Sequence, residues 1–342
     1  MKHTTIAVDL AKSVFEIAVS DQPGRVRERR RLTRARFLSV FIDRRPALVL
    51  MEACGSAHYW GRRIQALGHE VLLLPPHASR PYVTGNKTDR ADAKGLLEAH
   101  RNESIHPVPI KSVAQQALSA LHRLRSRWQA TRTARINTVR GLLREFGVTI
   151  PLGAQHLVAR VRREIRSEVS QVPAALYPVL EDACREIREL EQRVTTVERQ
   201  LKQLARQTPV VKQLLEIPGV GLLTATALIA FVGDVQRFRT GRHFASYLGL
   251  TPREYSSGKK RRLGRISKRG DVYLRMLLTH GARSVLWAAR RREEPDRLRV
   301  WALKVERLRG HNKATIALAN KLARIVWAVW KRGSVYREVP AA

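Results

Sequence analysis

The chain has 342 residues, a length that is sufficient for about two domains with hydrophobic cores of their own. It carries 64 Lys and Arg residues against 29 Asp and Glu residues, and this formal net charge of +35 favours a polyanionic partner, with nucleic acid first and an anionic membrane second. No apolar run approaches the length of a membrane-spanning helix, and two distant cysteines without metal-binding spacing argue against a disulfide framework and suit a reducing cytoplasm.

The N-terminal part of the chain predicts a mixed α/β sheet. Alternating apolar residues over 4–21, broken at Lys12, predict two strands, and the basic run 26–33 predicts a third strand beside them. After this meander, helices and buried strands alternate: helix 34–45, strand 47–53, helix 57–68, strand 71–76 and a helix that begins at Asp89. The order βββαβαβα is typical of a sheet that carries helices on its faces.

The middle of the chain predicts two long helices. Residues 113–147 read as one arginine-rich helix, in which we assign Arg123, Arg127 and Arg135 to nucleic-acid binding. Over 176–206, apolar residues recur at alternating steps of four and three: Leu176, Leu180, Ala183, Ile187, Leu190, Val194, Val197, Leu201 and Leu204. This heptad seam predicts a coiled coil whose partner helix lies in the same chain or in a second subunit. A helical spacer and an oligomerisation element are equally compatible with it.

A third region begins near Val210 and predicts a helical domain that extends to about residue 332. Residues 214–234 read as a helix, a Pro-Gly-Val-Gly turn and a second helix, which resembles a helix-hairpin-helix element. In such an element, Gly219 and Gly221 would turn backbone N–H groups toward a DNA phosphate. A plain helical hairpin is the alternative. Residues 251–270 predict a basic loop.

Four carboxylates stand out in a chain with so few acids. Asp89 and Asp92 share one face at the start of a helix, where they repel each other unless a cation lies between them. Asp9 lies in a strand that is otherwise apolar, and Glu52 ends the buried strand 47–53. If these two strands are neighbours, the four acids converge around two Mg²⁺ ions, which would clamp the attacking and leaving oxygens of a phosphoryl transfer. Taken singly, Asp89 could instead cap its helix, Glu52 could pair with a cation and Asp9 could bond backbone in a turn.

The basic loop contains a candidate nucleophile. It reads Tyr255-Ser256-Ser257-Gly258, and a serine hydroxyl becomes a nucleophile only with a base, a cationic setting or a metal beside it. The cations that follow could hold the scissile phosphate: Lys259, Lys260, Arg261, Arg262, Lys268 and Arg269. The alternative is a flexible DNA-binding loop in which the serines are spacers.

Four segments, in this order and spacing, resemble one protein family: VDLAKSVFEIAV, MEACGSAHYW, NKTDRADAK and GLTPREYSSG. They are similar to the DEDD insertion-sequence transposases and, within these, to the RNA-guided subgroup called the eleven-eleven type. The resemblance extends over nearly the whole chain. It implies an α/β plus all-α protein, with a RuvC-like RNase H fold over 1–111, a helical coiled-coil region over 112–208 and a C-terminal transposase domain with a helix-hairpin-helix over 209–342.

The resemblance also implies a chemistry. The four acids of the family, which bind Mg²⁺, correspond to Asp9, Glu52, Asp89 and Asp92. Its nucleophilic serine corresponds to Ser257, with the adjacent Ser256 as the other choice. The family further implies a site shared between subunits of a homo-oligomer, either a dimer or a tetramer, and a guide RNA that pairs with donor and target double-stranded DNA. It implies a bacterial cytoplasmic protein that acts at the nucleoid.

Our prediction is therefore a Mg²⁺-dependent DNA recombinase of an insertion sequence that cuts and rejoins strands through a covalent phosphoserine. Two other functions are compatible with the same residues. One is a metal nuclease of the junction-resolvase kind, in which water attacks the phosphate and Ser257 is incidental. The other is a nucleic-acid-binding scaffold without catalytic activity.

Overall fold

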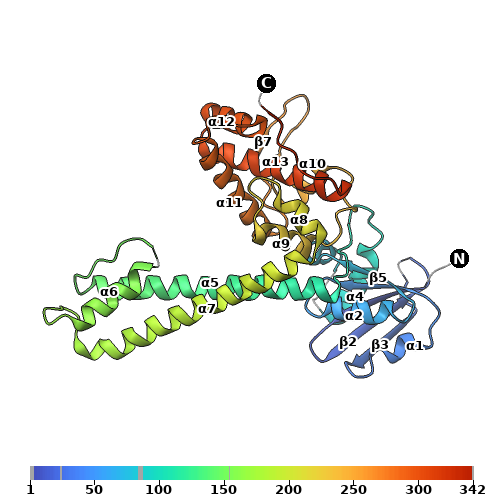
Figure 1. The fold of residues 1–342 in the computed structure, drawn as a ribbon. Helices are drawn as coiled ribbons and strands as arrows, with labels where there is room; N and C mark the ends of the chain where they lie inside the picture. The colour runs from blue at the N-terminus through green and yellow to red at the C-terminus, as the bar shows by residue number, and fades with distance from the viewer. Residues whose placement is uncertain (1–3, 24, 84–87, 154, 341–342) are drawn as a thin grey trace. The chain divides into compact units, whose positions relative to one another are not determined.

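The computed structural model describes residues 4–23, 25–83, 88–153 and 155–340. The chain divides into two compact units, Met1–Ala114 and Gln115–Ala342, and Figure 1 traces the elements of each. Within the described residues, no helix combines the length and the apolar character that a membrane crossing needs. The predicted split of the second unit at residue 208 stays a prediction.

The first unit is built on a five-stranded mixed sheet. Its strands are β1 (Thr5–Leu10), β2 (Val14–Ser20), β3 (Glu28–Thr33), β4 (Leu48–Glu52) and β5 (Glu70–Leu74). They lie in the order β3-β2-β1-β4-β5, with β1, β2 and β3 antiparallel and β4 parallel to both β1 and β5. The predicted mixed α/β sheet is confirmed. Because β1 and β4 are parallel neighbours, their carboxyl ends meet at the same edge of the sheet.

Helices pack on both faces of this sheet, and Figure 1 draws the helical elements of the first unit. They are α1 (Ser39–Ile42), α2 (Ala57–Gln65), α3 (Pro76–Ser79), the short 3-10 helix η1 (Arg80–Tyr82) and α4 (Asp89–Ala99). Phe41 of α1 and Ile64 of α2 pack in one core, on the face that also carries Ile6. On the other face, Leu96 of α4 packs in a separate core with Ala7. Each face of β1 therefore has its own helical layer.

The predicted helix 34–45 is wrong in its extent, because only Ser39–Ile42 is helical. The residues before it form turns that bring Phe37 into the core, where its ring centroid lies 4.6 Å from that of Phe15. Phe37 and Phe41 are both fully buried. Their spacing of four residues imitates helical periodicity, although a turn delivers the first of them.

The second unit begins with long helices. They are α5 (Val113–Arg144), α6 (Gln155–Arg166), the 3-10 helix η2 (Ala174–Leu176) and α7 (Tyr177–Arg206). Three ion pairs join α5 to α7: Arg125 with Glu198, Arg132 with Glu191 and Arg135 with Glu186. The partner number falls as the α5 number rises, so the two helices run antiparallel, as Figure 1 shows.

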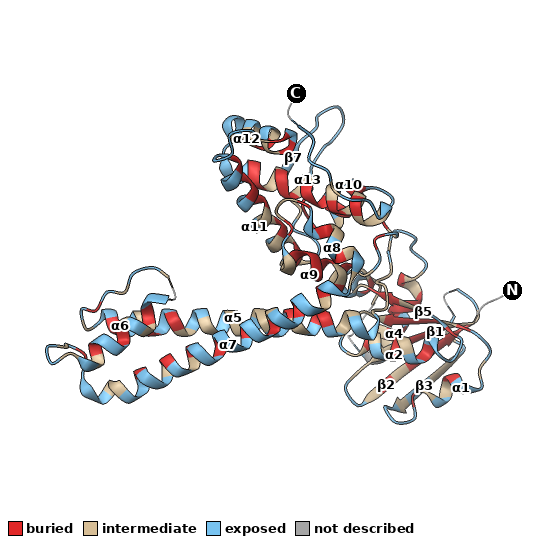
Figure 2. Ribbon diagram, in the orientation of Figure 1, coloured by how far each residue is buried: buried red, intermediate tan, exposed pale blue. Residues whose placement is uncertain are grey.

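The apolar seam of α7 packs within this chain. Its residues meet those of α5 and α6 in two cores: Leu180 and Ile187 with Ile136 and Val161, and Val197 and Leu201 with Leu118. Buried and exposed residues alternate along both long helices in Figure 2. In these contacts the apolar seam of α7 packs against helices of the same chain. Coiled-coil supercoiling stays a prediction.

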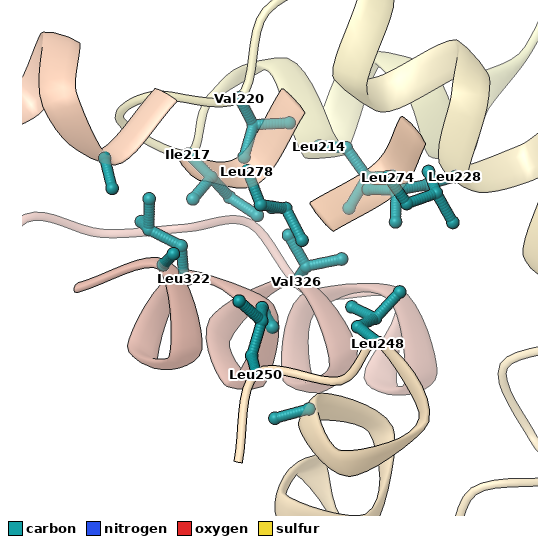
Figure 3. Packing of buried hydrophobic residues seen from close by; sticks show 14 of the residues in the cluster. Leu214, Ile217, Val220, Leu228, Leu248, Leu250, Leu274, Leu278, Leu322 and Val326 are labelled. Carbon is teal, nitrogen blue, oxygen red and sulfur yellow. The ribbon is translucent and has the colours of Figure 1, made fainter. Parts of the chain in front are cut away.

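The C-terminal part of the second unit packs around one large core. Its elements are α8 (Pro209–Leu215), α9 (Leu222–Val232), α10 (Gly241–Tyr247), β6 (Pro252–Glu254), β7 (Leu263–Ile266), α11 (Val272–Ala289), α12 (Arg297–Arg309) and α13 (His311–Arg332). Leu278 of α11 and Val326 of α13 are fully buried in this core (Figure 3). The predicted basic loop 251–270 contains the two-stranded hairpin β6–β7.

The turn between α8 and α9 packs on α11 so closely that their backbones are in contact. A Cβ atom on Gly219 would lie 2.7 Å from the carbonyl oxygen of Gly281, and one on Gly281 would lie 1.9 Å from that of Gly219. Gly219 also has a φ of +79°, which side chains disfavour. The turn between α8 and α9 therefore requires glycine on both sides of this contact.

Candidate active site

Asp9 and Glu52 lie at matching positions on neighbouring strands. The parallel pairing of β1 with β4 matches residues 5–8 with residues 48–51, and the two acids come next on their strands. Neighbouring strands are about 4.8 Å apart. Side chains alternate between faces along a strand, so Asp9 shares the face of Ala7 and Glu52 shares the face of Leu50, both of which lie in the core under α4. The two acids therefore leave the sheet on the α4 side.

The first turn of α4 supplies the other predicted acids. Asp89 is the first residue of the helix, and its side chain lies outside the described part of the structure. Thr88 is the N-cap, since its Oγ1 accepts from the backbone N–H of Ala91 at 3.2 Å, so the alternative role of Asp89 as a helix cap is wrong. Asp92 is half-buried and immediately precedes Ala93, which packs against the sheet.

The charges of Asp9 and Glu52 act on one nearby group. Burial raises the pKa of the Cys54 thiol, and the negative charges of Glu52 and Asp9 raise that pKa further. Both carboxylates therefore lie within electrostatic reach of the same half-buried side chain. Asp9 lies inside β1 rather than in a turn, which excludes the turn role as its explanation.

The donor chemistry of this edge fits a hard divalent ion. Carboxylate oxygens are the ligands that Mg²⁺ prefers. Asp9 and Glu52 lie on the sheet face that packs on α4, and Asp92 lies in α4 itself. Among the described side chains, no three His, Cys, Asp or Glu residues are grouped closely enough to hold a metal. The side chain of Asp89 is not among the described side chains.

Sequence reasoning missed one acid on the same face. Glu16 of β2 is the registered partner of Asp9, and opposite residues of an antiparallel pair share a face. Glu16 is half-buried. The signal that could have found it is the same one that singled out Asp9, a charged residue inside an otherwise apolar strand.

The two candidate serines lie beyond β6, near the tip of the β6–β7 hairpin. Ser256 Oγ donates to Glu254 Oε1 at 2.7 Å and accepts from the backbone N–H of Arg262 at 3.1 Å. Ser257 pairs with Lys260 through backbone atoms only. Its hydroxyl has no hydrogen-bond partner among the residues that the structure describes. The two neighbouring hydroxyls therefore differ in their availability for reaction.

The root of this hairpin is tightly fixed. A Cβ atom on Gly249 would lie 2.0 Å from the carbonyl oxygen of Arg269, and one on Gly270 would lie 1.9 Å from that of Tyr247. Arg275 of α11 donates to the carbonyl oxygens of Leu248 at 3.1 Å and of Arg269 at 3.4 Å. The hairpin is thus held at its root while its predicted phosphate-binding cations are exposed: Lys259, Lys260, Arg261, Arg262, Lys268 and Arg269.

The other predicted nucleic-acid contacts divide into two groups. Arg123 and Arg127 are exposed on α5. Gly221 is the N-cap of α9, and a Cβ atom placed there would meet nothing within 4 Å, so all three residues are accessible. Arg135 instead bonds to Glu186, which raises its pKa, and Gly219 packs on α11. These last two residues have structural contacts that the sequence did not predict.

Family models match both units. A DEDD transposase model of the IS110 type, described as "Transposase", matches residues 6–148. A second model, described as "Transposase IS116/IS110/IS902 family", matches residues 211–296. The acids fall within the first match and the serine hairpin falls within the second.

Similar proteins cover nearly the whole chain. A probable family 20 transposase of Pseudomonas aeruginosa is 43% identical over 98% of this chain and 99% of its own length. The transposase of insertion sequence element IS1111A of Coxiella burnetii is 38% identical over 97% of this chain and 91% of its own length. The transposase of insertion sequence element IS1328 of Yersinia enterocolitica is 36% identical over 97% of this chain and 98% of its own length.

Proposed function

The chain belongs to the IS116/IS110/IS902 family of transposases, and from this premise we propose that it cuts and rejoins DNA by forming a transient phosphodiester with Ser257. It is a DNA transposase, so its substrate is a DNA strand and its reaction is phosphoryl transfer. The observation that carries this proposal is the matched register of Asp9 and Glu52 on the face covered by α4.

The acids have the role of holding metal in this proposal. Two Mg²⁺ ions would be held by the carboxylates of four residues: Asp9, Glu52, Asp89 and Asp92. When bound, such ions supply a positive clamp on the attacking and leaving oxygens of the phosphate. The strand order of the first unit, a meander extended by two parallel strands, supports a RuvC-like RNase H fold for this domain.

Ser257 has the role of nucleophile. Its Oγ forms a bond to phosphorus, a bond between phosphorus and one deoxyribose oxygen breaks, and the hydroxyl proton passes to solvent while the departing oxygen takes up a proton. Rejoining reverses these changes with a different deoxyribose hydroxyl as attacker. Within the described residues, the Ser257 hydroxyl has no hydrogen-bond partner, which supports this choice. The Ser256 hydroxyl, in contrast, already donates a hydrogen bond to Glu254.

Nucleic acid is the partner that the charge supports. Exposed cations on the hairpin and on α5, with a net charge of +35, favour phosphate contacts. We include in the proposal a structured guide RNA that pairs with donor and target DNA, and a homo-oligomer whose active site combines acids and serine from different subunits. The location of the acids and the serine in separate units of the chain is compatible with such sharing.

Two variants test this function against a water-using nuclease. With guide RNA and both DNA partners present, Asp92→Asn should reduce strand cleavage more than about a hundredfold, because a charge that offsets the metal ions is lost. Ser257→Ala should abolish joining and cleavage together. If Ser257→Ala still cuts strands at the rate of the unaltered chain, water is the nucleophile and the serine step is wrong.

A further inference from the structure

A row of paired residues that runs across β1, β2 and β3 carries two acids followed by an arginine. Glu16 of β2 is opposite Asp9 on one side and opposite Arg31 of β3 on the other. Opposite residues share a face, so Arg31 lies on the same face of the sheet as the acids. Two positions earlier in β3, Arg29 is opposite Ala18, which lies in the core under α4. The acidic row therefore continues into Arg31 at the edge strand, and Arg29 lies two positions away on the same face.

A third arginine joins this edge from α4. The guanidinium of Arg29 donates to the backbone carbonyl oxygen of Arg90 at 3.2 Å, which ties β3 to the first turn of α4. Burial lowers the pKa of Arg29, the charge of Arg90 lowers it further, and Glu16 acts in the opposite direction. Arg29 and Arg90 are therefore close enough to repel each other beside the turn that carries Asp92.

Within the described part of the first unit, these three cations have no acidic partner at contact distance. The ion pairs found there involve other arginines: Arg27, Arg30, Arg44 and Arg101. Arg31 and Arg90 are exposed, and Arg29 is half-buried. Like charges gathered without counter-ions raise the free energy of the bare protein, and a bound anion removes that cost.

We propose that Arg29, Arg31 and Arg90 form a phosphate-binding track that leads a DNA strand into the acidic site. Residues two apart on a strand are about 7 Å apart, so Arg29 and Arg31 can each bind a different phosphate of one backbone. Guanidinium groups bind phosphate with paired hydrogen bonds. If one phosphate of a DNA strand lies at the acids, the neighbouring phosphates of that DNA strand would lie along β3.

The observations favour a nucleic-acid strand over a lipid surface. A flat anionic membrane laid on this edge would press its headgroups against Glu16 and Asp9, which lie in the same row as Arg31. A DNA strand can contact the arginines with some phosphates while a metal ion screens the one beside the acids. This inference rests on the proposed function, because it assigns a direction to the DNA at the proposed site.

A matched set of variants tests the track. Arg31→Gln and Arg90→Gln remove one track cation each, whereas Arg30→Gln removes the same charge from the opposite face of β3, where Arg30 pairs with Glu28. The full chain is titrated with a labelled DNA duplex from an end of the insertion sequence at several salt concentrations, with Ca²⁺ in place of Mg²⁺. Each track variant should bind about 5- to 10-fold more weakly at 0.1 M salt and lose about one unit of salt slope relative to Arg30→Gln.

Controls separate the outcomes. Arg31→Lys should recover most of the slope, and thermal unfolding should be unchanged in Arg31→Gln because that side chain is exposed. The track is refuted if Arg31→Gln and Arg30→Gln bind DNA with the same slope, or if Arg31→Gln weakens binding to phosphatidylserine vesicles and leaves DNA binding unchanged. If the slope falls as expected but the unaltered chain never cleaves DNA, the track stands and the proposed function fails.

Discussion

At the scale of single residues, hydrogen bonding separates two serines that the sequence could not. The Ser256 hydroxyl donates a hydrogen bond to Glu254 and accepts one from the backbone N–H of Arg262. The Ser257 hydroxyl has no hydrogen-bond partner within the described residues. These contacts depend on how β7 returns beside β6, and no local pattern in Tyr-Ser-Ser-Gly encodes that return. Asp9 could be singled out as a candidate because a charged residue in an apolar strand is visible in the sequence, yet Glu16 of β2 gives the same signal and was overlooked.

His122 is a second residue whose role only the structure reveals. It is fully buried, with Nε2 3.0 Å from Thr226 Oγ1 and Nδ1 3.1 Å from Tyr273 Oη. Thr226 already donates to the carbonyl oxygen of Leu222 at 2.7 Å, so it accepts from Nε2–H, and Tyr273 donates to Nδ1. Because its pKa is lowered by burial, the imidazole is neutral near pH 7, and it links α5, α9 and α11. Burial lowers its pKa to about 4, and the charge of Arg125 adds to this effect.

Acid should weaken the second unit through His122. The folded pKa is lower than the unfolded value, so the stabilising contribution is complete above about pH 6.5 and is lost as pH falls toward 4. The loss amounts to about 3 kcal/mol at pH 4. We expect the unaltered chain to lose about that much more unfolding free energy than His122→Phe between pH 7.5 and pH 4 in urea titrations. Equal losses in both proteins would show that the imidazole does not titrate in this way.

At the scale of elements, periodicity predicted the type of element better than its limits or its partners. The strands around Asp9 and Glu52 and both long helices were predicted close to their observed positions. The helix 34–45 was overextended because a turn can also bury Phe37. The hairpin 251–270 was missed because its strands are short, polar and exposed, and its root is fixed by close backbone contacts of glycine rather than by a buried apolar face.

Two helical glycines should respond to alanine in opposite directions. Gly281→Ala would place a Cβ atom 1.9 Å from the Gly219 carbonyl oxygen, so the α8–α9 turn must move, and we expect a loss of at least about 2 kcal/mol. Gly141→Ala in α5 meets nothing within 4 Å and should stabilise its helix by about 0.5–1 kcal/mol. Calorimetric melting of both variants checks the pair. A Gly281→Ala protein as stable as the unaltered chain would mean that the turn does not pack closely on α11.

At the scale of the whole molecule, the proposed chemistry divides between two units of one chain, with acids in the first and the serine hairpin in the second. No sequence pattern states whether one chain completes the site alone, since that depends on how separate units assemble. The resemblance to the transposase family implies a site shared between subunits, and the location of the acids and the serine in separate units is compatible with it.

Mixing two inactive variants tests whether subunits share the site. Asp92→Asn and Ser257→Ala each disable one half of the proposed chemistry. If acids and serine meet between subunits, mixed oligomers contain some sites that carry neither change, and recombination of donor and target DNA should reappear in the mixture. Activity that stays absent at every mixing ratio, with mixed oligomers verified by differential tags, would mean that each chain builds its own site.

In the proposed reaction, DNA becomes covalently attached to Ser257 during strand exchange. The direct measurement uses a donor DNA that is nicked beside the cleavage position, so that the released fragment diffuses away and the attached strand is trapped. Mass spectrometry of the digested complex then locates the nucleotide on the peptide around Tyr255-Ser256-Ser257-Gly258. We predict a phosphodiester on Ser257 that is absent from Ser257→Ala. Cleaved strands with no protein attached, or a nucleotide found on Ser256, would refute Ser257 as the nucleophile.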